Sequence, residues 1–170
     1  MSNPETSGRD DNRCWWGTAR TMFKHILVPT DGTAFSSKAA GHAIELAPPM
    51  GARLTFIHVL PLRPLPFFGG EGGMFVDQTE PDEFEQSARD AALRHLATLE
   101  AQAQSAGIPA GSVAQGGGAP YEVIIEVATE RGCDLILMAS HGRTGIKSMI
   151  LGSETQKVLT HTKIPVLVYR

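Results

Sequence analysis

The chain has 170 residues, of which 42% are hydrophobic and 19% charged, with a formal net charge of −3. These values predict a soluble globular protein of ordinary size and argue against a disordered chain. No apolar run approaches the roughly 18 residues that a membrane-spanning helix needs. The negative balance gives no reason to expect binding to nucleic acid or to an anionic membrane surface.

The two cysteines, Cys14 and Cys133, lie far apart in the sequence. This pattern excludes a disulfide framework and a cysteine-rich zinc site. The histidines are scattered without ligand-like spacing, so we expect no metal held by side chains alone. Because the start of the chain lacks the pattern of a secretory signal, the sequence predicts a cytoplasmic protein.

Two segments differ in composition from the rest. Residues 1–22 are polar and rich in turn formers, so we expect a disordered N-terminal tail. Residues 61–80 carry several prolines and glycines and predict a mobile loop, with a lid as one role for it. Residues 23–170, including that loop, are predicted to form one domain.

Short apolar runs alternate with longer helical patterns from residue 23 onward. The runs predict strands at 25–29, 54–60, 112–115, 133–138 and 164–168. The helical patterns predict helices at 33–46, 81–106, 120–132 and 153–160. We expect Pro48 and Pro49 to end the first helix, and Gly107 with Ile108 to end the second. This alternation predicts a mainly parallel sheet with helices on both faces.

Apolar residues in the first three predicted helices recur at the spacing that places them on one face. The stripes are Ala39, Ala43 and Ala47 in the first helix, Phe84, Ala88, Ala92, Leu96 and Leu99 in the second, and Tyr121, Ile124, Ile125 and Ala128 in the third. We interpret all three stripes as core.

The loop at residues 29–33 directly follows the first predicted strand. Ligands of open parallel sheets bind beyond the carboxyl ends of the strands, where the strand order reverses. Asp31 can accept hydrogen bonds from a ribose hydroxyl or a base, and Thr30 adds a hydroxyl group. Asp31 and Thr33 are equally suited to capping the helix that follows. The residues of this loop leave both interpretations open.

The loop at residues 139–153 follows the fourth predicted strand and is rich in glycine. Its glycines let the backbone approach a ligand closely, and Gly152-Ser153 opens the last predicted helix. Ser153 and Gln156 match a capping box. A helix N-terminus with nearby positive charge, here from Arg143 and Lys147, favours phosphate binding. The alternative is a glycine-rich turn that only feeds the helix.

Three segments of this sequence resemble the universal stress protein family. They are residues 26–32 (ILVPTDG), 139–143 (ASHGR) with 151–153 (LGS), and 164–168 (IPVLV). The resemblance covers essentially all of residues 23–170. It implies a five-stranded parallel sheet of order 3-2-1-4-5, an α/β open sandwich, and a homodimer built by pairing the last strands.

The nucleotide-binding branch of that family is marked by the motif G-x2-G-x9-G-[ST]. Gly142 and Gly152-Ser153 match it, whereas Ala139 stands at its first glycine. By the resemblance, Asp31 contacts adenosine, backbone at Val59 reads the adenine edge, and a divalent ion bridges the phosphates. The full set of residues that the resemblance and the loops predict for this site is Pro29, Thr30, Asp31, Val59, Met138, Ala139, His141, Gly142, Arg143, Gly145, Gly152, Ser153, Glu154 and Thr155.

Three functions follow from these residues as competing hypotheses. The first is a regulatory protein that binds ATP with Mg²⁺, signals to an unidentified protein partner, and hydrolyses ATP slowly at most. The second is a genuine ATPase or nucleotidyl transfer enzyme, for which the sequence offers no dedicated base. The third is a nucleotide-free dimeric interaction protein of the same family, which the alanine at position 139 favours.

Overall fold

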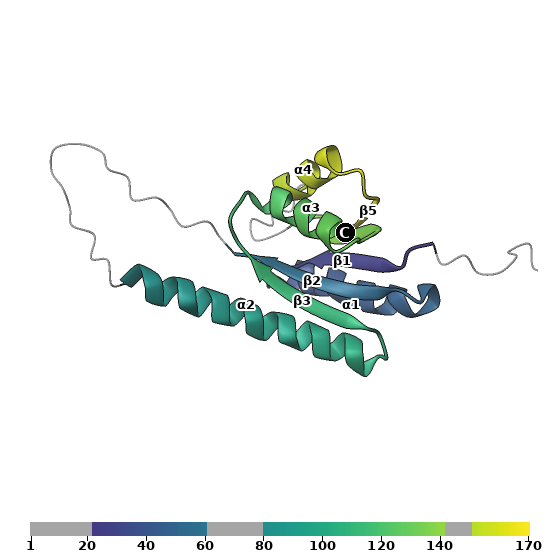
Figure 1. The fold of residues 1–170 in the computed structure, drawn as a ribbon, viewed down its shortest axis with the longest axis horizontal. Helices are drawn as coiled ribbons and strands as arrows, with labels where there is room; N and C mark the ends of the chain where they lie inside the picture. Colours follow the sequence, from purple (N-terminus) through teal and green to yellow (C-terminus); the bar gives the residue numbers. More distant parts are fainter. Residues whose placement is uncertain (1–21, 61–79, 142–150) are drawn as a thin grey trace, which may run out of the picture.

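The computed structural model describes residues 22–60, 80–141 and 151–170, and within the second helix the side chains from Glu85 onward (Figure 1). Its strands are β1 (His25–Pro29), β2 (Arg53–Val59), β3 (Ala110–Gln115), β4 (Leu135–Ala139) and β5 (Val166–Tyr169). Its helices are α1 (Ala34–Met50), α2 (Glu80–Ser105), α3 (Pro120–Glu130) and α4 (Ser153–His161). Nearly all of the predicted tail and the predicted mobile loop lies outside the described residues.

The strands form one five-stranded sheet in the order β3-β2-β1-β4-β5. Every neighbouring pair is parallel, with Ile26 of β1 opposite Leu54 of β2 on one side and Leu135 of β4 on the other. This order confirms the predicted fold. The direction of strand addition reverses between β1 and β4, so the carboxyl ends of these two strands flank the position where such sheets bind ligands.

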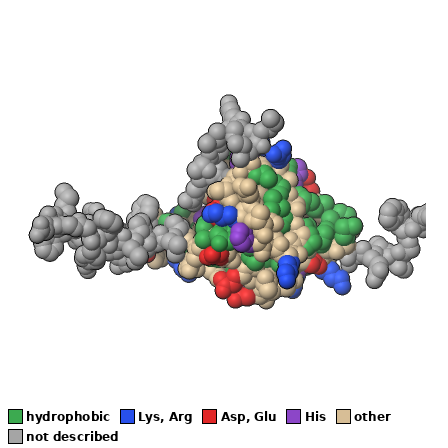
Figure 2. All heavy atoms as spheres, turned by 90° about the horizontal axis from the view of Figure 1, so that it is seen from above, with side chains coloured by type: hydrophobic (Ala, Val, Ile, Leu, Met, Phe, Trp, Pro, Cys, Tyr) green, Lys and Arg blue, Asp and Glu red, His purple; other side chains and the backbone are tan. Residues whose placement is uncertain are grey.

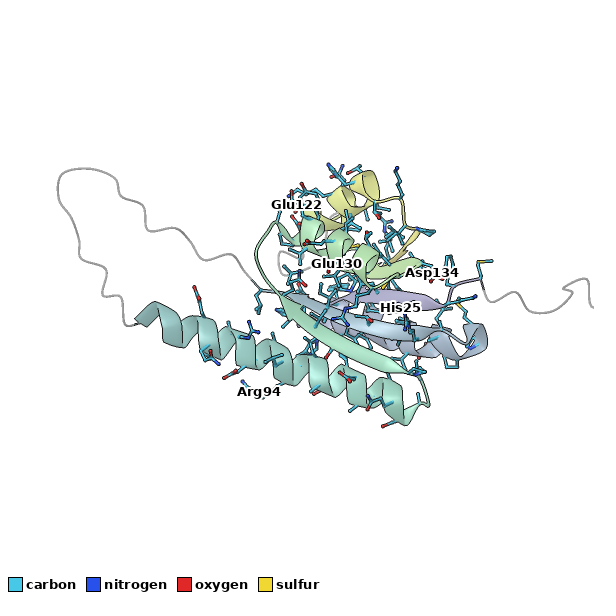
Figure 3. All side chains as sticks on the ribbon, viewed as in Figure 1. His25, Arg94, Glu122, Glu130 and Asp134 are labelled. Atoms are coloured by element: carbon cyan, nitrogen blue, oxygen red, sulfur yellow. The ribbon has the colours of Figure 1, made fainter. Side chains whose placement is uncertain are left out.

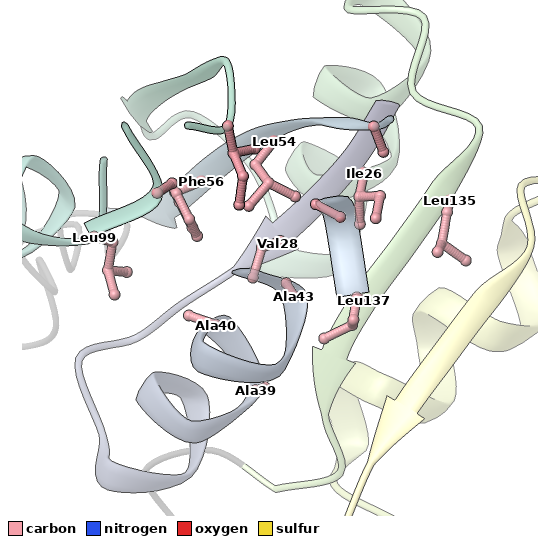
Figure 4. Close-up of a cluster of buried hydrophobic side chains, with 14 of the residues drawn as sticks. Ile26, Val28, Ala39, Ala40, Ala43, Leu54, Phe56, Leu99, Leu135 and Leu137 are labelled. Atoms are coloured by element: carbon pink, nitrogen blue, oxygen red, sulfur yellow. The ribbon is translucent and has the colours of Figure 1, made fainter. Parts of the chain in front are cut away.

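Helices cover both faces of the sheet, and each face has its own core. On one face, alternate residues of β1 such as Ile26 and Val28 pack with α1 and α2. On the other, Leu27 packs with α3 and with Val158 of α4. Figure 4 shows the first of these cores, in which Val28 lies next to Ala40 and Ala43 of α1. The predicted alanine stripe of α1 is completely buried.

The first helix does not end where the sequence predicted. Pro48 and Pro49 lie inside α1, which continues to Met50. The turn closes at Gly51, whose φ of 61° is left-handed, and the N–H of Ala52 donates to the carbonyl of Ala47 at 3.1 Å. The prediction was wrong because two prolines in a last turn remove N–H donors without displacing the glycine that ends the helix.

The second helix ends as predicted at Gly107, where φ is 76° and the N–H of Ile108 donates to Ala103. The third helix buries the predicted residues Ile124 and Ala128, but its buried face is shifted from the predicted stripe. Its buried residues are Val123, Ile124, Val127 and Ala128, whereas Tyr121 and Ile125 are half-buried. Tyr121 packs at the margin of this core and also against the ring of His161 in α4, with 5.1 Å between the ring centroids.

The fourth and fifth strands begin two residues later than predicted, at Leu135 and Val166. The N–H of Cys133 is already used, since it donates to Ala128 at the end of α3. Similarly, the N–H of Ile164 donates to the hydroxyl of Thr162. Local bonds at the helix ends therefore displace the starts of both strands.

Candidate nucleotide site

A cleft of about 370 Å³ opens at the carboxyl ends of β1, β2 and β4, at the reversal of strand order. Its lining consists of Pro29, Thr30, Asp31, Ser36, Ile57, Val59, Pro120, Ile124, Met138, Ala139, His141, Gly152, Ser153, Glu154 and Thr155. Apolar side chains from β2, β4 and α3 form one part of the cleft lining. Polar groups from the loop after β1 and from the start of α4 form the other part.

The loop after β1 is held by hydrogen bonds within itself. Thr33 caps α1, because its hydroxyl accepts the N–H of Ser36 at 3.2 Å. Asp31 in turn accepts the N–H of Thr33 at 3.0 Å and its hydroxyl at 2.7 Å. The structure thus divides the two roles left open by the sequence: Thr33 caps the helix, and Asp31 orients Thr33 while lining the cleft.

Asp31 carries a negative charge at neutral pH. Burial acts to raise its pKa, but hydrogen bonds from the hydroxyl groups of Ser36 and Thr33 and from backbone N–H groups lower it below its ordinary value. These donors favour the ionised carboxylate. A carboxylate in such surroundings is a good hydrogen-bond acceptor and a poor general base.

The start of α4 forms the opposite wall of the cleft. The helix begins at Ser153, with Gly152 as its N-cap and no side-chain cap. The predicted capping box between Ser153 and Gln156 is therefore wrong, because Ser153 is already inside the helix. The N–H of Gly152 donates to the carbonyl of Ser140 at 2.8 Å. A Cβ atom at position 152 would lie 3.1 Å from that oxygen, so any larger residue would be crowded against the backbone after β4.

Ala139, which replaces the first glycine of the family motif, fits its place in the structure. It ends β4 as a paired strand residue opposite Tyr169. Its side chain is buried in the core shared with α1 and α2, although the residue also lines the cleft. Its carbonyl accepts the hydroxyl of Thr155 at 3.0 Å. The methyl group is accommodated without disturbing the contact between β4 and α4.

Glu154 joins the start of α4 to the start of α3. Its Oε2 accepts the N–H of Tyr121 at 3.0 Å, and its Oε1 accepts the ammonium group of Lys157 at 2.9 Å. Glu154 also lines the cleft, in the first turn of α4. An anion bound at that terminus would meet this charge as well as the N–H groups of the helix.

The structure places most of the predicted site residues in the lining of one cleft. Pro29, Thr30, Asp31, Val59, Met138, Ala139, His141, Gly152, Ser153, Glu154 and Thr155 all belong to it. His141 is partly exposed, and its Nδ1 lies 3.0 Å from the hydroxyl of Ser140. The predicted residues Gly142, Arg143 and Gly145, and Lys147 near them, lie outside the described residues.

Sequence reasoning missed four residues of the lining, namely Ser36, Ile57, Pro120 and Ile124. Three of them had a detectable signal. Ile57 lies two positions before Val59 and so on the same face of β2. Pro120 and Ile124 are four apart and therefore neighbours on one side of α3, but only the packing of α3 against the sheet shows which side faces the cleft.

Figure 2 shows that acidic and basic side chains are scattered over one face of the molecule rather than gathered into a single charged surface. Within residues 22–60, 80–141 and 151–170, no cluster of three or more histidine, cysteine or acidic side chains could hold a metal ion. Over the same residues, no helix is long and apolar enough to cross a membrane.

Comparison with known proteins identifies the fold and the family. The family model described as "Universal stress protein family" matches residues 22–170. The chain belongs to this family. Universal stress protein YxiE of Bacillus subtilis is 32% identical over 149 residues, which cover 88% of this chain and all of that protein.

Solved structures agree with this assignment. The structure of MJ0577, a universal stress protein of Methanocaldococcus jannaschii, superposes with a TM-score of 0.67 and is 27% identical, covering 86% of this chain and 95% of that chain. A universal stress protein of Archaeoglobus fulgidus in complex with dAMP gives a TM-score of 0.58, at 19% identity over 86% and 98% of the chains. This second likeness concerns the fold alone.

Proposed function

We propose that this universal stress protein is a regulatory adenine-nucleotide binder that takes ATP with Mg²⁺ in the cleft at the strand ends. One observation carries the proposal: apolar walls, a charged acceptor and a helix N-terminus line the same cleft at the reversal between β1 and β4. Occupancy would then change a surface that a partner protein reads. The family relationship supports the choice of ligand, and a protein of the same fold has been solved in complex with dAMP.

The composition of the cleft fits the parts of a nucleotide. Its volume of about 370 Å³ lies within the range of about 300–1,000 Å³ for small-molecule sites. Ile57, Val59 and Met138 offer an apolar surface to a base. Asp31, which is ionised, offers an acceptor to ribose hydroxyls. The N-terminus of α4 offers backbone N–H groups and a positive dipole to phosphates.

Magnesium belongs in the proposal for electrostatic reasons. Mg²⁺ is usually bound through substrate phosphates and one or two carboxylates rather than by a protein cage. The charge of Glu154 beside the N-terminus of α4 disfavours a bare polyphosphate. A divalent ion on the phosphates would reduce this repulsion.

Binding rather than rapid turnover follows from the state of the two carboxylates. Asp31 accepts hydrogen bonds that lower its pKa, and both oxygens of Glu154 already accept hydrogen bonds. The lowered pKa makes Asp31 a poor proton acceptor near neutral pH, and Glu154 is engaged by two donors. We propose that ATP hydrolysis, where it occurs, is slow.

The proposal also includes a cytoplasmic homodimer paired through β5. This strand lies at the edge of the sheet, where its outer N–H and C=O groups are available to a second chain. Leu167, near the centre of the strand, is 40% exposed. Pairing of two β5 strands would cover this side chain and extend the sheet.

Calorimetric titration with ATP and Mg²⁺ tests the proposal. The wild-type protein should bind with a Kd in the micromolar range, about −8 kcal/mol. Asp31→Asn replaces the ionised acceptor proposed for the ribose hydroxyls with a neutral amide and should weaken binding by about tenfold. Glu130→Gln removes one charge from the exposed end of α3 and serves as the matched control.

Each alternative predicts a different result from this titration. The absence of heat with ATP, ADP and AMP would contradict the proposal and favour a nucleotide-free interaction protein. Steady turnover near about 1 s⁻¹ or faster, as in ordinary enzymes, would favour a genuine ATPase.

A further inference from the structure

Helix α2 contacts the ligand-binding loop through His95. The Nε2 atom of His95 lies 3.0 Å from the hydroxyl oxygen of Thr30. Thr30 is buried and lines the cleft, whereas His95 is half-buried and lies on the middle turns of α2. The two residues are 65 positions apart, so this contact exists only because α2 packs across the sheet.

Thr30 passes this contact on to Asp31. Its hydroxyl lies 3.1 Å from the hydroxyl of Ser36. Ser36 in turn accepts the N–H of Asp31 at 3.3 Å, and its hydroxyl is among the groups that lower the pKa of that carboxyl. A continuous chain of side-chain contacts therefore leads from α2 to the charged acceptor of the cleft.

The acceptors within reach of Ser36 favour one direction for this chain of hydrogen bonds. Ser36 has one hydroxyl hydrogen, and its acceptors on the loop are the carbonyl of Thr33, at 3.1 Å, and the carboxylate of Asp31. If that hydrogen points to the loop, Thr30 must donate to Ser36. The oxygen of Thr30 then accepts from His95, so the imidazole hydrogen is on Nε2. Donors aligned in one direction strengthen each other when the surroundings are partly buried.

We propose that His95 is a positioning residue of the nucleotide site. By donating to Thr30, it orders the hydroxyl groups that hold Asp31 in the orientation that receives the ligand. The inference rests on the proposed function for the identity of the ligand. Its structural part, the ordering of the loop by α2, can be measured without any ligand.

Two amide variants separate the hydrogen bond from the bulk of the ring. In His95→Gln the amide nitrogen reaches about as far as Nε2, whereas in His95→Asn it reaches only as far as Nδ1. We expect His95→Gln to bind ATP with Mg²⁺ within about twofold of the wild type. We expect His95→Asn to bind about tenfold more weakly, which is the usual effect of one lost hydrogen bond.

The control is Arg94→Gln, a substitution of the adjacent exposed residue on the same helix. Figure 3 shows Arg94 on the side of α2 that faces away from the sheet. This variant should bind like the wild type. The double variant Thr30→Val with His95→Asn should bind no more weakly than Thr30→Val alone, since both substitutions interrupt the same contact.

Amide hydrogen exchange in the ligand-free protein provides the second measurement. The N–H groups of Asp31, Gly32 and Thr33 have side-chain acceptors within this network. In His95→Asn they should exchange faster, while the amides of the β1 core and the midpoint of urea unfolding stay nearly unchanged. His95→Gln should restore the slow exchange.

The outcomes distinguish this inference from the proposed function. If the wild-type protein binds no adenine nucleotide, the proposed function fails, and the exchange rates alone decide the role of His95. Wild-type exchange rates in His95→Asn would overturn the inference. So would an equal loss of nucleotide binding in the Gln and Asn variants, because it would show that the ring fills space rather than donating.

Discussion

The two ends of the parallel sheet use polar residues in opposite ways. At the amino ends of β1 and β4, Asp134 accepts the N–H groups of Lys24 and His25 at 2.9–3.0 Å. The ring of His25 is closed in as well, since its Nδ1 donates to the carbonyl of Arg131 and its Nε2 lies 2.8 Å from the hydroxyl of Thr55. Figure 3 shows His25 and Asp134 at this end of the sheet.

At the carboxyl ends of the same strands, polar groups line an open cleft. Asp31 is held by its own loop and by the hydroxyl network that leads to His95. The N-terminus of α4 has no side-chain cap. In this sheet the polar groups at the amino end are closed by hydrogen bonds to each other, whereas the carboxyl end leaves a cleft open, which is the site of the proposed ligand. Substitutions at the amino end should therefore reduce stability, whereas substitutions at the carboxyl end should change ligand binding.

Loss of the Asp134 carboxylate should have the largest effect on stability. Asp134→Ala removes the acceptor of two backbone N–H groups at the start of β1. We expect the free energy of unfolding to fall by about 2 kcal/mol, the cost of leaving such donors without an acceptor. Urea unfolding measures it, with Glu130→Gln as a control. If Asp134→Ala weakened nucleotide binding by as much free energy as it lost in stability, the two ends of the sheet would not have separate roles.

Glu154→Gln should change binding more than stability. The amide oxygen can still accept the N–H of Tyr121, but the charge beside the N-terminus of α4 is lost. Without Mg²⁺, the variant should bind ATP several-fold more tightly than the wild type, because one repulsion near the phosphates is removed, worth about 1 kcal/mol at a partly exposed site. With Mg²⁺ the difference should shrink. Equal affinities without Mg²⁺ would place the phosphates elsewhere.

Lowering the pH should reduce the free energy of unfolding through His25, at the amino end of the sheet. Burial, followed by the guanidinium of Arg53, lowers the pKa of His25 below its ordinary value. The unfolded chain therefore takes up a proton at a pH where the folded chain does not, so the free energy of unfolding decreases as the pH falls through about 6.5. Urea unfolding at about pH 7.5 and about pH 5.5 should show a smaller decrease in His25→Leu than in the wild type. An equal decrease would assign the acid sensitivity to other groups.

The sequence predicted the strand order only through the family resemblance, but it predicted the elements from local signals. The buried run of β1 gave its bounds correctly, and Gly107 ended α2 as expected. Local signals also misled in two places. The prolines in α1 did not end it, because Gly51 supplied the left-handed turn one residue after Met50. In α3 the buried face includes Val123 and Val127, which helical spacing alone did not select over Tyr121.

Most of the candidate site was predictable because its polar residues follow strand ends, and the topology of a parallel sheet brings those ends together. The apolar half of the lining was harder. Ile124 faces the cleft only because α3 packs against that part of the sheet.

What the sequence determined by itself is therefore what depends on neighbours along the chain: strand periodicity, glycine stops and the loops after β1 and β4. Only the tertiary structure decided which distant groups meet. The contact of His95 with Thr30 and that of Asp134 with Lys24 join residues that no local pattern relates. Hydrogen bonds of this kind depend on the packing of whole helices and strands, and that packing is set by all of the core residues together.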